Sequence, residues 1–283
     1  MHTLSMCRLF GFRSVIPSQV HSSLVSAENA LVVQSSDHPD GWGVAYYVAQ
    51  APHVIKSARD AVEDGLFKRV SGIVSSETVV AHVRKATQGN LSLINSHPFQ
   101  YGSWVFAHNG NIPGFTDDRE RYLRLVPPAL KRFILGDTDS EVVFYLLLGH
   151  LARRYDLHRR GYPVQELFDA IRDTVDELAA VAQMDPYDPE SHFYLTMLVT
   201  NGNVMAGHQG GKELLVSTHK QHCPERETCP SFAPECEGRS DSGFISHLLL
   251  SSERLQGDNV WEELEPGAIV GVDSRMQYST SSK

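Results

Sequence analysis

The chain has 283 residues, of which 41% are hydrophobic and 21% charged, and its 25 Lys and Arg against 34 Asp and Glu give a formal net charge of −9. This composition is typical of a globular protein of one large or two small domains, and it excludes instability from small size. An acidic balance without a dense run of Lys and Arg argues against nucleic acid as a standing partner.

Targeting signals and disulfides are not expected. No segment approaches the roughly 20 consecutive apolar residues that span a bilayer, so no membrane association is predicted. The opening residues MHTLSM have neither the basic region nor the apolar core of a secretory signal. Four cysteines in a chain of this length fit a reducing, cytoplasmic location better than a disulfide scaffold.

The first part of the chain predicts β-strands. Apolar, β-rich runs at residues 7–12, 42–48, 79–83 and 104–107 are separated by turn-forming segments, with a helix expected over 58–73. No internal repeat and no low-complexity linker divides the sequence, so one domain is the simplest organisation.

The middle of the chain changes to helical spacing. Thr138 and Glu141 stand in the pattern of a capping box, and apolar residues follow at helical intervals, which predicts a helix over 140–154. A second amphipathic helix is expected to open with Pro163 as its first helical residue, so that two helices lie side by side.

Strands return in the last part of the chain. They are predicted over 193–200, 204–208, 213–218, 244–251 and 268–273, with a hairpin at Asn201 and Gly202. Strands, then helices, then strands again indicate layered sheets. The prediction is an α+β sandwich with helices on the outer faces of the sheets, not a doubly wound parallel sheet.

Cys7 is the first candidate for chemistry. If translation begins at Met6, or if residues 1–6 are removed, Cys7 becomes the first residue and carries both a thiol and a free α-amine. The α-amine has a pKa of roughly 7.7 to 8.0 and the thiol one of about 8.5, so the pair supplies a nucleophile and its base. The alternative is an ordinary buried strand cysteine.

Further motifs follow in a recognisable order. They are MCR at 6–8, DGWG at 40–43, AHVRKATQG at 81–89, NSHPF at 95–99, AHNGN at 107–111 and GDTDSE at 136–141. In this order they resemble those of the class-II glutamine amidotransferases, which are N-terminal-nucleophile hydrolases. The chain is most similar to stand-alone members of that group, which include γ-glutamyl hydrolases of thiol metabolism. The resemblance implies a four-layer αββα sandwich, a single domain over 7–283, and a leader, 1–6, that is absent or removed.

The resemblance also assigns roles that match what a glutamyl group needs. Arg84 offers a planar fork to the α-carboxylate, with a hydroxyl bond from Thr87. Asp139 takes the α-ammonium, and Asn109 and Gly110 form the oxyanion hole. The alternatives are that Asp139 only serves the start of a helix and that Asn109 and Gly110 form only a turn.

Histidines are weaker candidates. His97 is the one most expected to contact substrate, whereas His82 and His108 are expected to pack around the site. The loop at 40–43 is expected to line the pocket. The chemistry calls for no cofactor and no metal.

A Cys- and Pro-rich insertion at about 219–242 stands apart from these motifs. Five potential ligands, His219, His222, Cys223, Cys229 and Cys236, could hold a structural zinc ion. The spacings between the cysteines do not match the usual short knuckles, so a plain loop with free thiols is the preferred interpretation.

Three functions stay open. The preferred one is an amidohydrolase that cleaves the γ-amide of glutamine or of a small γ-glutamyl compound through a thioester on Cys7. The second is a glutaminase subunit that delivers ammonia to a separate synthase or amidase partner. The third is a non-catalytic glutamyl-binding protein that keeps its leader.

Overall fold

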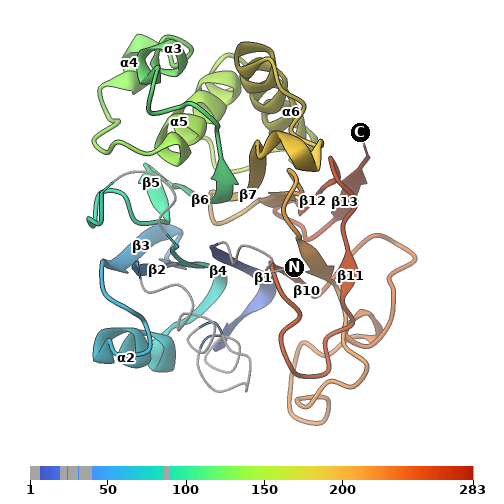
Figure 1. Ribbon diagram of the computed structural model, residues 1–283. Helices are drawn as coiled ribbons and strands as arrows, with labels where there is room; N and C mark the ends of the chain where they lie inside the picture. The colour runs from blue at the N-terminus through green and yellow to red at the C-terminus, as the bar shows by residue number, and fades with distance from the viewer. Residues whose placement is uncertain (1–6, 20–23, 25–30, 32–39, 86–89, 283) are drawn as a thin grey trace.

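The fold is taken from a computed structural model of the chain, which describes residues 7–19, 24, 31, 40–85 and 90–282 (Figure 1). The predicted leader, 1–6, and the predicted site residue Thr87 lie outside the described residues. None of the helices in the described ranges is long and apolar enough to cross a membrane.

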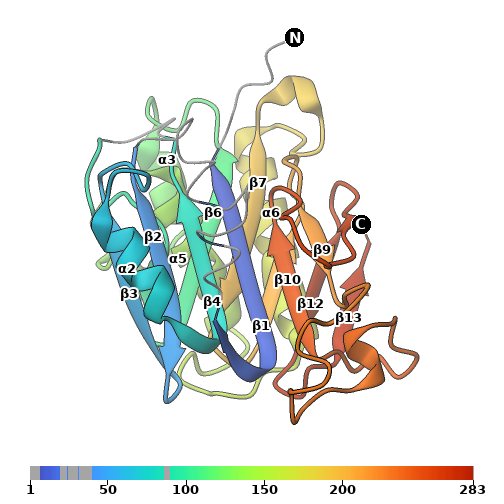
Figure 2. The same cartoon turned by 90° about the horizontal axis from the view of Figure 1, so that it is seen from below.

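Two antiparallel sheets form the centre of the molecule (Figure 2). The first has the strand order β11-β9-β10-β1-β4-β2-β3. Its strands are β1 (Arg8–Gln19), β2 (Trp42–Val48), β3 (Ala51–Ser57), β4 (Ser75–Val83), β9 (Leu215–Ser217), β10 (His247–Ser251) and β11 (Glu262–Glu263). Strand β1 lies in the middle of this sheet, paired with β10 on one side and β4 on the other.

The second sheet has the order β13-β12-β8-β7-β6-β5. Its strands are β5 (Phe99–Tyr101), β6 (Trp104–Asn111), β7 (Tyr194–Thr200), β8 (Met205–His208), β12 (Ile269–Val272) and β13 (Tyr278–Ser281). The predicted hairpin at Asn201 and Gly202 joins β7 to β8, and Gly202 has a φ of +89° there. A positive φ is the conformation that glycine adopts without steric cost.

Helices cover the outer faces of both sheets (Figure 1). They are α2 (Gly65–Ile73), α3 (Arg119–Leu123), α4 (Pro128–Lys131), α5 (Asp139–Ala152) and α6 (Val164–Ala182), with 3-10 turns at Pro189–Ser191 and Pro234–Cys236. Helices α5 and α6 pack against each other, as predicted, on the second sheet. Helix α2 packs on the first sheet.

Side-chain alternation along the strands explains the layers. On β1, Leu9 faces the apolar core between the two sheets, whereas Phe10 and Phe12 face the core beneath α2. On β6, Val105 faces the core between the sheets and Phe106 faces the helices. Because each sheet is apolar on both faces, each needs a covering layer on both sides. The αββα sandwich predicted from the sequence is confirmed.

Several predicted boundaries were wrong, for local reasons. The expected helix over 58–73 begins only at Gly65, because Asp64 caps it by accepting from the Leu66 N–H, and the strand β3 occupies 51–57. Pro163 is the N-cap residue of α6 and not its first helical residue. Thr138 caps α5 as predicted, but the Glu141 carboxylate bonds the N–H groups of residues 135 and 136.

Candidate active site

Cys7 lies directly before β1, and its thiol contacts the backbone that follows β4. The register pairs Arg8 with Val83, so Sγ reaches Lys85: it donates to the carbonyl and accepts from the N–H, both at 3.2 Å. Burial raises the pKa of the Cys7 thiol, and the Lys85 backbone and the Arg84 charge offset this only partly. Such a thiol needs a base before it acts as a nucleophile.

Arg84 is held at the end of β4 by the loop at 40–43. Its N–H donates to the Gly41 carbonyl at 2.8 Å, and its own carbonyl accepts from the Asp40 N–H at 3.2 Å. The residue is 3% exposed, and Nη1 donates to the Asn90 carbonyl at 3.3 Å. The loop was expected to line the pocket, and this prediction is wrong. None of the four loop residues is among the described residues that line it. It positions Arg84 instead.

Asp139 is the first residue of α5, and it is 3% exposed. Its Oδ2 accepts from the Ile112 N–H at 2.9 Å, and its Oδ1 accepts from the Ser140 N–H at 2.7 Å. The cap is Thr138, whose Oγ1 accepts from the Glu141 N–H, so Asp139 is not needed for capping. Burial raises the pKa of Asp139 to about 6. A buried carboxylate of this kind is stabilised by any cation that enters the site.

Asn109 lies on β6 and is 3% exposed. Because side chains alternate along a strand, the Asn109 side chain projects to the same side as that of Val105, toward the space between the sheets. By the same alternation, the Cys7 side chain projects to the same side as that of Leu9, also toward this space. Asn109 Oδ1 has no hydrogen-bond partner among the described residues. An amide in a buried position with an unmet oxygen is available to a ligand.

Gly110 is fixed by its neighbours. A Cβ there would lie 1.9 Å from His108 Nε2 and 2.3 Å from the Tyr194 carbonyl oxygen, so no larger residue fits without displacement. His108 in turn contacts helix α5, with Nδ1 at 3.0 Å from Ser140 Oγ, and burial lowers its pKa to about 4. The neutral imidazole therefore connects the β6 strand to the residue that bonds Asp139.

His97 is 4% exposed and packs between two rings. Its centroid lies 4.3 Å from that of His82 and 4.7 Å from that of Phe99. Burial lowers the pKa of His97 well below its ordinary value, and the charges of Arg84 and Lys56 lower it further. Neither ring nitrogen meets a hydrogen-bond partner in the described ranges. A histidine in this state is a weak base and a potential hydrogen-bond donor to a ligand.

One pocket gathers these side chains from segments far apart in the sequence. It is lined by Cys7, Arg84, Lys85, His97, His108, Gly110, Thr138, Asp139 and Ser140, and it encloses about 20 Å³. Asn109 is buried beside it on β6 and is not among the lining residues. This volume corresponds to about one water molecule.

Lys85 and Ser140 line the pocket, although neither was assigned a site role from the sequence. Lys85 holds the Cys7 sulfur through its backbone, a contact between residues 78 positions apart that any residue type could make. Ser140 acts at a different place: its hydroxyl contacts His108 Nδ1 and donates to the Asp139 carboxylate. Its place directly after Asp139 at a predicted helix start was the only available signal.

The insertion at 219–242 does not gather its five potential zinc ligands. Within the part of the chain that the structure describes, no three His, Cys, Asp or Glu side chains are placed to hold a metal ion. His222 Nδ1 lies 3.5 Å from a Glu237 carboxylate oxygen, and His219 Nδ1 lies 3.3 Å from Thr218 Oγ1. All four cysteines are free.

Comparisons with known proteins agree with the motifs. The family model described as "Glutamine amidotransferases class-II" matches residues 6–281. The Escherichia coli (strain K12) protein named "Putative glutamine amidotransferase YafJ" is 31% identical over 182 residues, which cover 61% of this chain and 65% of that protein. The gamma-glutamyl-hercynylcysteine sulfoxide hydrolase of Mycobacterium tuberculosis (strain CDC 1551 / Oshkosh) is 36% identical over 74 residues, or 26% of this chain and 32% of that protein.

A solved structure shows the same fold. A glutamine aminotransferase class-II domain protein from Silicibacter pomeroyi has a TM-score of 0.62 and 19% identity, with 98% of this chain and 99% of that chain covered. The chain spans less than two thirds of the length of the curated relatives named above.

Proposed function

The chain belongs to the class-II glutamine amidotransferases, and we propose from this premise that it is an amidohydrolase that cleaves the γ-amide of glutamine or of a small γ-glutamyl compound. The observation that carries the proposal is that Cys7, Arg84, Gly110 and Asp139, which come from four separate segments, line a single pocket. A relative named as a hydrolase of a γ-glutamyl compound supports this reaction class.

The substrate's charged groups fit the charges around the pocket. A buried guanidinium at Arg84 suits an α-carboxylate, because its planar fork donates two parallel hydrogen bonds. The carboxylate of Asp139 suits an α-ammonium, which would stabilise its ionised form. Thr87 is proposed to add a hydroxyl bond to the carboxylate, and His97 to donate a hydrogen bond at the pocket wall.

The proposed reaction proceeds through a thioester. The free α-amine of Cys7 takes the thiol proton, and the thiolate attacks the γ-carbonyl carbon. The side-chain N–H of Asn109 and the backbone N–H of Gly110 bind the oxyanion. The protonated amine returns its proton to the leaving nitrogen, which departs as ammonia or an amine. Water then hydrolyses the γ-glutamyl thioester to glutamate and restores the thiol.

The need for the α-amine follows from the state of the pocket. Burial raises the pKa of the Cys7 thiol and lowers the pKa values of His97 and His108, so neither histidine is a strong base for it. An α-amine with a pKa of roughly 7.7 to 8.0 is matched to the task. We therefore propose that residues 1–6 are absent from the active protein.

The test combines intact mass with glutamate release. We expect purified active protein to start at Cys7 and to release glutamate from glutamine or from a γ-glutamyl dipeptide. Cys7→Ala should reduce release to background, whereas Cys229→Ala, the matched control, should leave it unchanged. Full activity in Cys7→Ala, or in protein that keeps residues 1–6, would contradict the mechanism. Release that requires an added partner protein would favour ammonia delivery to a synthase, and ligand binding without turnover would favour the non-catalytic reading.

A further inference from the structure

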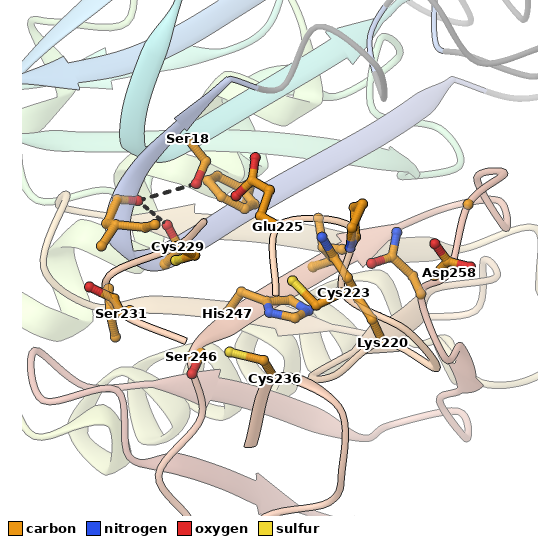
Figure 3. A pocket seen from close by; sticks show the side chains of 18 of the residues that line it. Ser18, Lys220, Cys223, Glu225, Cys229, Ser231, Cys236, Ser246, His247 and Asp258 are labelled. Carbon is orange, nitrogen blue, oxygen red and sulfur yellow. Dashed lines mark hydrogen bonds between the residues drawn. The ribbon is translucent and has the colours of Figure 1, made fainter. Parts of the chain in front are cut away.

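A second, larger cavity lies at the other end of β1 from Cys7. It encloses about 550 Å³ between the insertion, the Phe12–Ser18 half of β1, and β10 with the residue before it (Figure 3). It shares no described lining residue with the pocket that contains Cys7. Its volume falls within the range of small-molecule sites, which is about 300 to 1,000 Å³.

Three buried polar atoms with unmet hydrogen-bonding capacity belong to residues that line this cavity. Ser246 Oγ, His247 Nε2 and Asn259 Oδ1 have no partner among the residues the structure describes. Ser246 is 6% exposed and His247 is 9% exposed. Leaving a buried polar atom without a hydrogen-bond partner is costly, so three of them on residues around one cavity favour a polar ligand there.

Charges of both signs line the same cavity. Lys220 takes part in none of the ion pairs between described residues. Burial, followed by the charge of Lys220, lowers the pKa of His247 to about 4, which leaves its imidazole neutral. The acids Glu225 and Asp258 line the cavity as well. A purely cationic ligand would face the like charge of Lys220, and a purely anionic ligand would face those of Glu225 and Asp258.

The remaining wall is apolar. Phe12 and Leu249, on the paired strands β1 and β10, lie opposite each other in register and contribute to this wall. We propose that the cavity binds a small zwitterion, an α-amino acid or a dipeptide with an apolar side chain. The carboxylate binds Lys220 and Ser246, the ammonium binds Asn259 and Asp258, and the apolar side chain packs on Phe12 and Leu249.

The cysteines of the insertion supply a built-in reporter. Cys223, Cys229 and Cys236 line the cavity, and Figure 3 shows all three among the side chains around it. A ligand that fills the cavity would therefore shield their thiols from an alkylating reagent.

The test uses the Cys7→Ala protein, so that binding is measured without turnover and independently of the proposed reaction. The probes are L-leucine and L-leucyl-L-leucine, with leucinamide and 4-methylpentanoate as analogues that each lack one charge. We expect saturable one-to-one binding of a zwitterion by calorimetry, about tenfold or more weaker binding of both analogues, and slower iodoacetamide labelling of Cys223 and Cys236.

Variants distinguish the cavity from other sites. Lys220→Met and Asn259→Leu should each weaken binding about tenfold or more. The exposed control Lys68→Met should not, and neither should Asp139→Asn. The absence of saturable zwitterion binding, equal binding of the analogues, unaltered binding in both cavity variants with native thermal unfolding, or loss of binding in Asp139→Asn would each overturn the proposal.

Discussion

Single residues in the pocket that contains Cys7 have pKa values that burial moves away from their ordinary values. Burial raises the pKa of the Cys7 thiol and that of Asp139, and lowers those of His97 and His108. Each shift has the sign that desolvation imposes, because a low-dielectric environment disfavours the charged form. The pocket is consequently short of strong bases and contains an acid that is ready to bind a cation.

Asp139→Asn should show this energetically. The native pKa of Asp139 is raised from 3.8 to about 6, so the folded protein holds this proton more tightly than the unfolded chain does. The free energy of unfolding is therefore highest at low pH, and it falls by roughly 3 kcal/mol as the pH rises from about 4 to about 6. D139N has no titrating group at this position and should not show this loss. Its stability relative to wild type should therefore be about 3 kcal/mol higher at pH 8 than at pH 4. Chemical denaturation at the two pH values measures it, with exposed Asp176→Asn as control. A difference that does not change with pH would contradict the expected ionisation.

Asp139→Asn should also separate stability from activity. Loss of the carboxylate removes the proposed partner of the substrate's α-ammonium, and KM should rise about 10²-fold or more in steady-state assays at pH 8. Wild-type kcat/KM should decline below about pH 8 as the α-amine of Cys7 is protonated, and it should fall more steeply below about 6, where Asp139 is protonated as well. A D139N protein with unchanged KM would remove Asp139 from the substrate site.

Gly110→Ala tests the close packing around the oxyanion position. The added methyl group would lie 1.9 Å from His108 Nε2 and 2.3 Å from a backbone oxygen, so the strand or the histidine has to move. We expect a loss of about 2 kcal/mol in the free energy of unfolding and a large fall in kcat. Gly65→Ala, where nothing lies within 4 Å of the added Cβ, should be neutral or slightly stabilising. Equal effects at the two glycines would contradict this view of the site.

At the scale of elements, the start of helix α5 organises one side of the pocket. Two of its first residues make bonds outside the helix: Asp139 accepts from the Ile112 N–H, and Glu141 accepts from the N–H groups of 135 and 136. Asp137, just before the helix cap, exchanges hydrogen bonds with Asn95. A Cβ on Gly136 would lie 2.3 Å from Asn95 Oδ1, so a glycine is needed where these segments meet. The helix therefore positions Asp139 through its neighbours as well as through its own backbone.

Glu141→Ala should loosen this arrangement. Two hydrogen bonds to a buried carboxylate are lost, and each such bond contributes about 1.5 to 3 kcal/mol, less the cost of burying the charge. We expect a net loss of about 2 kcal/mol in the free energy of unfolding and a KM increase through displacement of Asp139. Glu120→Ala, at an exposed side chain of helix α3, is the control. Unchanged KM in a destabilised E141A would show that the helix start and Asp139 are uncoupled.

The elements themselves were largely predictable. Alternating and helical spacings gave β2, β6 and α5 within a few residues, because these segments bury long apolar stretches. Helix α2 was predicted too long, because residues 58–64, between the end of β3 and the Asp64 cap, form bends and turns and not helix. The capping pattern at Thr138 and Glu141 identified a helix start but not the bonds that Glu141 makes to the preceding loop.

At the scale of the whole molecule, stability depends on the core between the two sheets. Leu198 of β7 is fully buried there, and a Cβ on Gly11 of β1 would lie 3.0 Å from its Cδ1, so the sheets approach closely at this point. The proposed nucleophile, Cys7, directly precedes β1 of one sheet, and the proposed oxyanion hole lies on β6 of the other. Their relative position is therefore set by this core.

Leu198→Ala should destabilise the sandwich by about 3 kcal/mol, because the cavity it leaves lies between two rigid sheets that cannot close on it. Leu135→Ala, at a side chain that is 74% exposed, should change the free energy of unfolding by less than about 0.5 kcal/mol. Denaturant titrations of the two variants give the comparison. Similar losses in both would show that the inter-sheet core does not dominate stability.

The sequence by itself determined the types and order of the chemical groups. The motifs at 81–89, 107–111 and 136–141, the helix cap at Thr138 and the strand periodicities are local patterns, and local patterns are readable because they reflect backbone geometry and burial over a few residues. Only the tertiary structure decided that Lys85 holds the Cys7 sulfur, that the loop at 40–43 supports Arg84 and that the insertion borders a second cavity. Those contacts join residues far apart along the chain, and their desolvation and distances depend on how the two sheets pack.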